Sequence, residues 1–233
     1  MIKLKPRLME IAKILLPPSA EALPLAVCDV GTDHGYIPIY FVQKGVRFAI
    51  AADVSKDSAN KALLNVKNYE LEDQIDVRVG DGLSILSDYE ADTVIIAGMG
   101  GVLITKILAV GVPKGVKRIA LQPMRDAYEL RQWLAQNGYR IIDESLALES
   151  GRQYNIILVE VGEEENTDEF DLFIGAKLIQ KKHALLLAYA KLEYNRINKK
   201  IDGQTVSNRA VDAKLLIFKQ GLEKILEDGG IRL

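Results

Sequence analysis

The sequence predicts an α/β fold built on a seven-stranded, mostly parallel sheet, and two observations lead to this prediction. Between residues 25 and 160, short apolar runs alternate with amphipathic segments of helix length, as in successive βαβ units. The last two apolar runs are separated only by residues 149–153, too few for a helical crossover, which predicts an antiparallel last strand. The strands are expected at residues 25–30, 48–52, 76–79, 93–97, 118–121, 139–148 and 154–160.

An amphipathic helix is expected ahead of the sheet. Over residues 6–16, apolar side chains fall on one helical face, and Pro17-Pro18 ends the pattern. We expect this helix to pack beside the sheet.

Two long helices are expected after the sheet. Apolar residues recur at three- and four-residue steps over 172–194 and again over 211–225, and the helix-breaking pair Asp202-Gly203 lies between the two patterns. The sequence therefore predicts a C-terminal α-helical hairpin, similar to a short coiled coil, behind an acidic linker. The expected domains are residues 1–162 and residues 163–233.

Composition and charge restrict the class of protein. Of 233 residues, 48% are hydrophobic and 27% are charged, which is typical of an ordinary globular protein. No apolar run is long enough for a membrane span, no signal-peptide core is visible, and a single cysteine excludes an internal disulfide, so we expect a cytoplasmic protein. Residues 1–169 hold 18 Lys and Arg against 25 Asp and Glu, whereas residues 170–233 hold 12 against 7. The basic tail is suited to face a polyanion.

The first predicted strand runs into a loop suited to a cofactor. Gly31 and Gly35 let the backbone turn sharply and approach a ligand closely. Asp33 stands where a dinucleotide-binding loop has its middle glycine, and its charge would repel a phosphate. S-adenosylmethionine instead carries a sulfonium and an ammonium, which Asp29 and Asp33 attract. The alternative is an ordinary turn in which Asp33 caps the next helix.

Three further motifs follow the later strands. Asp53 ends the second strand, 18 residues after Gly35, where a carboxylate can accept hydrogen bonds from both ribose hydroxyls. Asp81 lies between two glycines after the third strand, where it suits an adenine amine, and a plain turn is the alternative. After the fourth strand, residues 98–101 include three glycines, more than a turn requires.

Because ligands bind open parallel sheets at the carboxyl ends of the strands, we expect these motifs to form one S-adenosylmethionine site. The predicted cofactor-binding residues are Asp29, Gly31, Thr32, Asp33, His34, Gly35, Asp53, Val54, Gly80, Asp81, Gly82, Gly98 and Met99.

Residues 29–38, 80–83, 97–101 and 121–123 closely resemble the bacterial tRNA (adenine-22-N1)-methyltransferase family. The likeness extends to the N-terminal segment with Arg7, to Arg152-Gln153-Tyr154 and to the C-terminal helical hairpin. The resemblance implies a class I Rossmann-like methyltransferase fold, and the transfer of a methyl group from S-adenosylmethionine to N1 of an adenine in the D-arm region of tRNA.

Methylation of a ring nitrogen fits the rest of the sequence. Adenine N1 carries an in-plane lone pair, so the reaction needs alignment and desolvation but no obligatory general base. Accordingly, the chain lacks the Asn/Asp-Pro-Pro-Tyr run that many exocyclic-amine methyltransferases place after strand four. A paired adenine must be flipped out, and Tyr36 and Tyr154 are candidate platforms for it, with ordinary packing as the alternative. The predicted catalytic residues are Asp33, His34, Gly98, Met99, Gly100 and Tyr154.

The expected partner is tRNA, bound by a monomer or weak dimer, with no membrane and no metal. The two histidines lie 149 residues apart and there is one cysteine, so no zinc-type ligand cluster is visible. Two alternatives stay open: methylation of another RNA, a protein or a small molecule, and a non-catalytic RNA-binding factor with a methyltransferase shell. The predicted RNA-binding residues, for which a solvated surface is the alternative, are Arg7, Arg125, Arg152, Lys177, Lys181 and Lys182.

Overall fold

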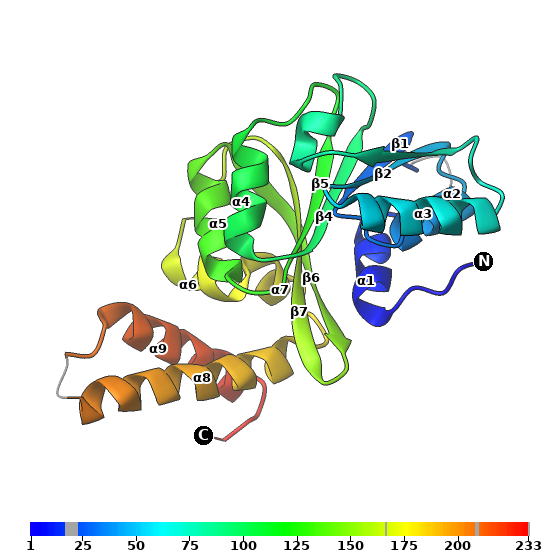
Figure 1. The fold of residues 1–233 in the computed structure, drawn as a ribbon. Coiled ribbons are helices and arrows are strands. Elements are labelled where there is room, and N and C mark those ends of the chain that lie inside the picture. Colours follow the sequence, from blue (N-terminus) through cyan, green and yellow to red (C-terminus); the bar gives the residue numbers. More distant parts are fainter. Residues whose placement is uncertain (17–22, 166, 208–209, 233) are drawn as a thin grey trace. The chain divides into compact units, whose positions relative to one another are not determined.

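The computed structural model describes residues 1–16, 23–165, 167–207 and 210–232 (Figure 1). The chain divides into two compact units, Met1–Glu165 and Asn166–Leu233, which are described one at a time. None of the described helices is both long and apolar enough to cross a membrane.

The first unit is built on one seven-stranded sheet with the order β3-β2-β1-β4-β5-β7-β6. The pairs among β1 to β5 are parallel, whereas β7 is antiparallel to both β5 and β6. All seven predicted strands are present, and each boundary falls within two residues of its predicted position. The strands are β1 Ala26–Val30, β2 Phe48–Asp53, β3 Ile75–Val79, β4 Thr93–Met99, β5 Arg118–Pro123, β6 Tyr139–Glu149 and β7 Arg152–Val161.

Helices cover both faces of this sheet, because its strands are apolar on both sides. Val27 and Ala49 belong to the core cluster on the face of α1 and α2, whereas Cys28 and Ile50 belong to the cluster on the face of α4 and α5. Cys28 is the small buried hydrophobe expected from the sequence, and burial raises the pKa of its thiol to about 12. The helical segments are α1 Pro6–Leu15, α2 Tyr36–Gln43, α3 Lys56–Asn68, the 3-10 turn η2 Gly82–Ile85, α4 Gly101–Ala109 and α5 Ala127–Gln136.

The predicted N-terminal helix is confirmed as α1, which packs beside the sheet through Ile11, Ala12 and Leu15. Its predicted stop, Pro17-Pro18, lies outside the described residues. The backbone N–H of Arg7 donates to Glu149 Oε2 (3.0 Å), and Ser145 Oγ donates to Glu10 Oε1 (2.7 Å). These hydrogen bonds hold α1 against the hairpin of β6 and β7.

The second unit corrects two helix predictions. The expected helix over 172–194 is broken at Gly175, where φ is 100°, and again after Gln180, where Lys182 has φ 47° and His183 Nδ1 accepts the N–H of Leu185 (3.1 Å). Conversely, Asp202-Gly203 lies inside a helix, since an interior glycine costs only about 1 kcal/mol. The helices are α6 Glu169–Ile174, α7 Ala176–Gln180, α8 Leu186–Val206 and α9 Ala213–Asp228.

The expected antiparallel hairpin is formed by α8 and α9. Tyr194 donates its hydroxyl to Glu223 Oε1 (3.2 Å), and Leu187, at the start of α8, lies against Gly229, which follows α9. Side-chain contacts of this kind pair the beginning of one helix with the end of the other.

Candidate active site

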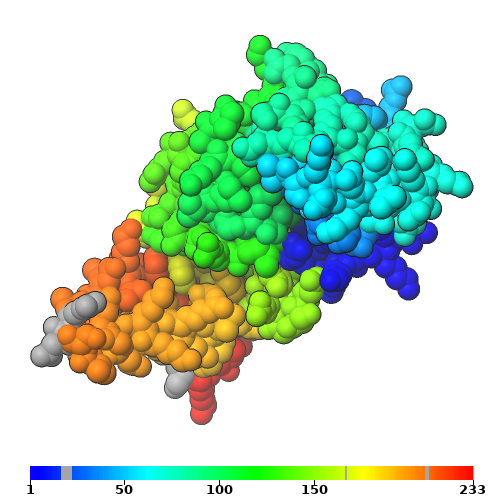
Figure 2. Space-filling model, in the orientation of Figure 1, coloured from blue at the N-terminus to red at the C-terminus, as the bar shows by residue number. Residues whose placement is uncertain are grey.

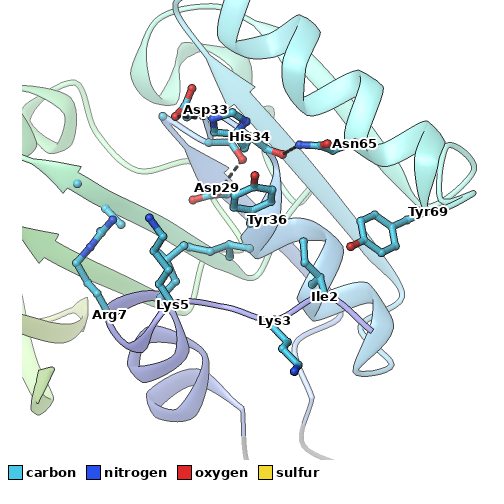
Figure 3. Close-up of a pocket in the computed structure, with 16 residues that line it drawn as sticks. Ile2, Lys3, Lys5, Arg7, Asp29, Asp33, His34, Tyr36, Asn65 and Tyr69 are labelled. Carbon is cyan, nitrogen blue, oxygen red and sulfur yellow. Dashed lines mark hydrogen bonds and ion pairs between the residues drawn. The ribbon is translucent and has the colours of Figure 1, made fainter. Parts of the chain in front are cut away.

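A pocket of about 700 Å³ opens at the carboxyl ends of β1 and β4 (Figure 3). Its inner wall consists of the loop after β1 and the end of β4. The N-terminal segment, residues 2–8, forms the opposite wall, and residues at the start of α2 and the end of α3 complete it. Figure 2 shows the dark blue N-terminal segment lying against the surface of α2 and α3.

The loop after β1 and the end of β4 meet at Gly31. The N–H groups of Gly31 and Thr32 both donate to the carbonyl of Ala52, at 2.8 and 2.9 Å, which turns the chain sharply at φ 77°. A Cβ at this position would overlap the terminal methyl of Met99. The backbone of Gly31 is thereby brought close to the β4 motif, as the glycine pattern predicts.

Asp29 is the buried charge of the pocket, with 3% of its surface exposed. Burial raises the pKa of its carboxyl to about 7, even though Thr32 Oγ1 donates a hydrogen bond to it (2.7 Å) and opposes the shift. The nearby Asp53 carboxylate raises this pKa further, and Arg7 lowers it. A cationic ligand would stabilise the ionised form, so the residues fit the sulfonium and ammonium of S-adenosylmethionine.

Asp53 fixes the shape of the same loop. Its Oδ2 accepts the N–H of Asp33 (3.1 Å) and its Oδ1 accepts the N–H of Ser55 (2.9 Å). Each carboxylate oxygen keeps a lone pair for a ribose hydroxyl. Asp33 does not cap the next helix, because α2 begins after Gly35 and has no side-chain cap. Its own carboxylate lies near His34 Nε2 (3.5 Å) and faces solvent.

Six of the predicted cofactor residues line the pocket: Asp29, Gly31, Thr32, Asp33, His34 and Gly98. The other seven do not: Gly35, Asp53, Val54, Gly80, Asp81, Gly82 and Met99. Gly35 packs helices together, since a Cβ there would stand 3.2 Å from the Cβ of Ala62. Gly80 donates its N–H to the carbonyl of Asp53 (3.0 Å), which ties the third motif to the second. Asp81, Gly82 and Val54 complete this group, with Asp81 and Val54 exposed beside the loops.

The end of β4 is held by a buried amide that sequence reasoning left without a role. Gly98 sits at a bulge between Ala97 and Met99, and its N–H donates to Gln122 Oε1 (3.1 Å). Arg7 Nη1 donates to the same oxygen, and Gln122 Nε2 donates to the carbonyl of Pro123 (2.8 Å). Gln122 is fully buried. The signals in the sequence were a polar residue near the end of an apolar strand and its place in the 121–123 stretch that carries the family resemblance.

Two of the predicted catalytic residues, Tyr154 and Gly100, each lie beside an arginine. The guanidinium of Arg7 lies 5.8 Å above the ring of Tyr154, which is half-buried against the core and does not line the pocket. Gly100 precedes α4 and lies beside Arg125, whose side chain is 81% exposed and pairs with Asp126 (3.5 Å).

The other predicted RNA-binding residues are not among those that line the pocket. Arg152 is exposed at the start of β7, Lys177 belongs to α7, and Lys181 and Lys182 are exposed in the turn that follows α7 in the second unit. Within the described ranges, no group of three or more His, Cys, Asp or Glu side chains is placed to hold a metal ion.

Several residues that line the pocket were given no role from the sequence, among them Ile2, Asn65 and Tyr69. They come from the N-terminal segment and from α3, and no local motif marks them.

Strands in the order 3-2-1-4-5-7-6, with an acidic glycine loop after the first, are the arrangement of the class I methyltransferases that use S-adenosylmethionine, and this chain is a methyltransferase of that class. Sequence comparison gives the family. The model of the TrmK family, tRNA (adenine(22)-N(1))-methyltransferase, matches residues 27–227, and this chain belongs to that family. The fold and the family expected from the sequence are confirmed.

Relatives support the family over most of the chain. The tRNA (adenine(22)-N(1))-methyltransferase of Bacillus subtilis (strain 168) is 34% identical over 194 residues, which cover 80% of this chain and 79% of the relative. The structure of M. capricolum TrmK in complex with S-adenosyl-homocysteine is 27% identical, with a TM-score of 0.74, and covers 98% of this chain and 99% of that one.

A Streptococcus pneumoniae protein solved in complex with S-adenosyl-L-methionine is 29% identical to this chain, with a TM-score of 0.80, and the match covers 97% of this chain and 100% of that one. The cofactor expected from the charges of the loop is therefore confirmed.

Proposed function

We propose that this chain methylates N1 of adenine 22, in the D-arm region of tRNA, with S-adenosylmethionine as the methyl donor. The observation that carries the proposal is the buried Asp29 carboxylate beside Gly31 at the carboxyl end of β1. A desolvated carboxylate next to exposed backbone suits a cationic cofactor, and the family gives the acceptor.

The proposed cofactor contacts come from the two loops that Asp53 joins. Asp29, which lines the pocket, would face the positive charge of the amino-acid end. Asp53, which holds the loop through the Asp33 N–H, would accept the ribose hydroxyls, and Asp81 would accept the adenine amine. Thr32, Asp33 and His34 line the wall between them. When bound, the cofactor supplies a methyl group made electrophilic by its sulfonium.

The proposed acceptor site is the end of β4, with Gly98, Met99 and Gly100. The lone pair of adenine N1 forms the new N–C bond as the S–C bond breaks, and S-adenosyl-homocysteine leaves as a neutral thioether. The positive charge stays on the methylated adenine, so no proton has to be removed in this step. The protein has to align the base and exclude water, which the closely packed Gly31 and Met99 favour.

Each unit contributes residues to the proposed tRNA contacts. Residues 1–162 would act as the methyltransferase domain and residues 163–233 as a helical RNA-binding domain, whose charge of 12 Lys and Arg against 7 Asp and Glu over residues 170–233 attracts phosphate. We assign the protein to the cytoplasm, as a monomer or weak dimer. The proposed phosphate contacts are Arg7, Arg125, Arg152, Lys177, Lys181 and Lys182.

The proposal is tested with labelled S-adenosylmethionine and two transcribed tRNAs that differ only at position 22, adenine in one and guanine in the other. We expect labelled 1-methyladenosine in the first tRNA and none in the second. Equal labelling of both tRNAs would place the reaction at another nucleotide. If neither tRNA is labelled although the protein binds the cofactor, the methyl acceptor is not tRNA.

A further inference from the structure

The pocket has a second end that differs in chemistry from the cofactor end. The inner end contains Asp29, Gly31 and Gly98. The outer end is lined by two tyrosines, Tyr36 and Tyr69, and the basic N-terminal segment faces them across the pocket (Figure 3). Basic side chains repel a sulfonium, so this end is less suited to that group than the inner end is.

The two tyrosines present ring surface to the pocket. Tyr36 stacks on His34 with ring centroids 5.1 Å apart and an interplanar angle of 10°, so His34 covers one face of the Tyr36 ring. Tyr36 nevertheless keeps 39% of its surface exposed, and Tyr69 keeps 40%. Asn65, one turn before Tyr69, donates from Nδ2 to the carbonyl of His34 (2.8 Å). This hydrogen bond fixes the end of α3 against the start of α2.

Lysine side chains lie on the opposite wall. Lys3 and Lys5 are exposed and line the pocket, and no ion pair joins either of them to another described residue. Figure 3 shows Lys5 pointing into the cavity beside Arg7, whereas the Lys3 side chain points away from the two tyrosines. The segment is held in place at Ile2, which is buried and donates its N–H to Gln43 Oε1 (2.8 Å). The segment that contains the two lysines is therefore held in place against α2.

We propose that this outer end binds a second, unpaired nucleotide of the RNA, next in the strand to the methylated adenine. Its base would lie against Tyr36 and Tyr69, and its phosphate near Lys5. This inference rests on the proposed function. When an adenine leaves a helix, its neighbour loses a stacking partner as well, and aromatic rings accept any base. Unpaired lysines attract phosphate independently of sequence.

The test measures the dissociation constant of transcribed tRNA at fixed salt for Tyr69→Ala and Tyr69→Phe, with the wild type and Tyr89→Ala for comparison. Tyr89 is exposed and does not line the pocket, which makes it a matched control. We expect Tyr69→Ala to weaken tRNA binding about tenfold or more, because a base loses its stacking surface. Tyr69→Phe keeps the ring and should bind as the wild type does.

Two tRNAs with an abasic nucleotide, at position 21 or at position 23, complete the test. The loss of tRNA affinity caused by Tyr69→Ala should disappear with one of these two tRNAs, because that tRNA already lacks the base that stacks on Tyr69. An unchanged penalty on both, or equal tRNA binding by Tyr69→Ala and wild type, would contradict the inference. Weaker S-adenosylmethionine binding by Tyr69→Ala, with tRNA binding intact, would assign the outer end to the cofactor.

The failure of the proposed function would look different from the failure of this inference. The dissociation constants need no catalysis, whereas the proposed function depends on 1-methyladenosine formed by the wild type. Lys5→Gln gives a second, independent variant, for which we expect a smaller dependence of tRNA affinity on salt.

Discussion

Replacing Asp29 by Asn should make the protein more stable and bind its cofactor less well. The carboxyl of Asp29 has its pKa raised from 3.8 to about 7, mainly by burial. At 1.36 kcal/mol per pKa unit, ionisation of this group costs the folded state about 4 kcal/mol. Asn keeps a carbonyl oxygen that can accept the Thr32 hydroxyl, so the substitution removes the charge and retains the hydrogen bond.

The stability difference should depend on pH in one direction. Because the folded state holds the Asp29 proton more tightly than the unfolded chain, the wild type loses free energy of unfolding as pH rises from 3.8 to about 7, and the full cost remains above that range. Asp29→Asn should therefore match the wild type near the low end of this range and exceed it by up to about 4 kcal/mol above it. Urea unfolding at several pH values measures this difference.

The same substitution should act in the opposite sense on the cofactor. A lost charge-assisted hydrogen bond, about 1.5–3 kcal/mol, corresponds to an S-adenosylmethionine dissociation constant raised roughly tenfold or more. For the wild type, affinity should rise between about pH 6 and pH 8 as Asp29 ionises, and this dependence should vanish in the variant. An Asp29→Asn protein that is less stable above pH 7, or that binds the cofactor as tightly as the wild type, would refute the reasoning.

Three further predictions follow from the site. Gly31→Ala should weaken cofactor binding measured by calorimetry, because a side chain is strained at φ 77° and its Cβ displaces the Met99 methyl, and the double variant with Met99→Ala should relieve only the second effect. Gln122→Leu leaves Arg7 and the Gly98 N–H without their acceptor; we expect a loss of about 1–3 kcal/mol in the free energy of unfolding and a lower kcat with cofactor affinity retained. Charge reversal of Lys181 and Lys182 together should raise the KM for tRNA and reduce its salt dependence, with no change in cofactor binding, whereas an unchanged KM would remove these lysines from the RNA surface.

The sheet was predictable from the sequence because each strand is a local pattern. Apolar runs and the short 149–153 connection determine the strands and the antiparallel end, and Gly31 has to be glycine for a reason visible in the loop itself. Helix boundaries in the second unit were less predictable. A helix ends at Gly175, inside a continuous apolar pattern, whereas α8 continues through Gly203. The packing around each glycine, which the local sequence does not show, decides whether the helix continues.

The rest of the site could not be predicted because its residues meet only after folding. Tyr69 and Lys5 are 64 positions apart in the sequence and line one pocket. Gln122 acts through Arg7, 115 residues away, and neither position carries a local motif that links it to the other. Gly35 satisfied a cofactor pattern, yet its contact is with Ala62 of a neighbouring helix.

The attachment of α1 to β6 and β7 has a consequence for the order of folding. The hydrogen bond from Arg7 to Glu149 spans 142 residues, and that from Ser145 to Glu10 spans 135. During synthesis the first helix leaves the ribosome early but finds its partners only when the hairpin near residue 150 has emerged. Contacts between residues so far apart in the sequence form slowly, so we expect α1 to reach its final position on the sheet only after the β6–β7 hairpin has formed.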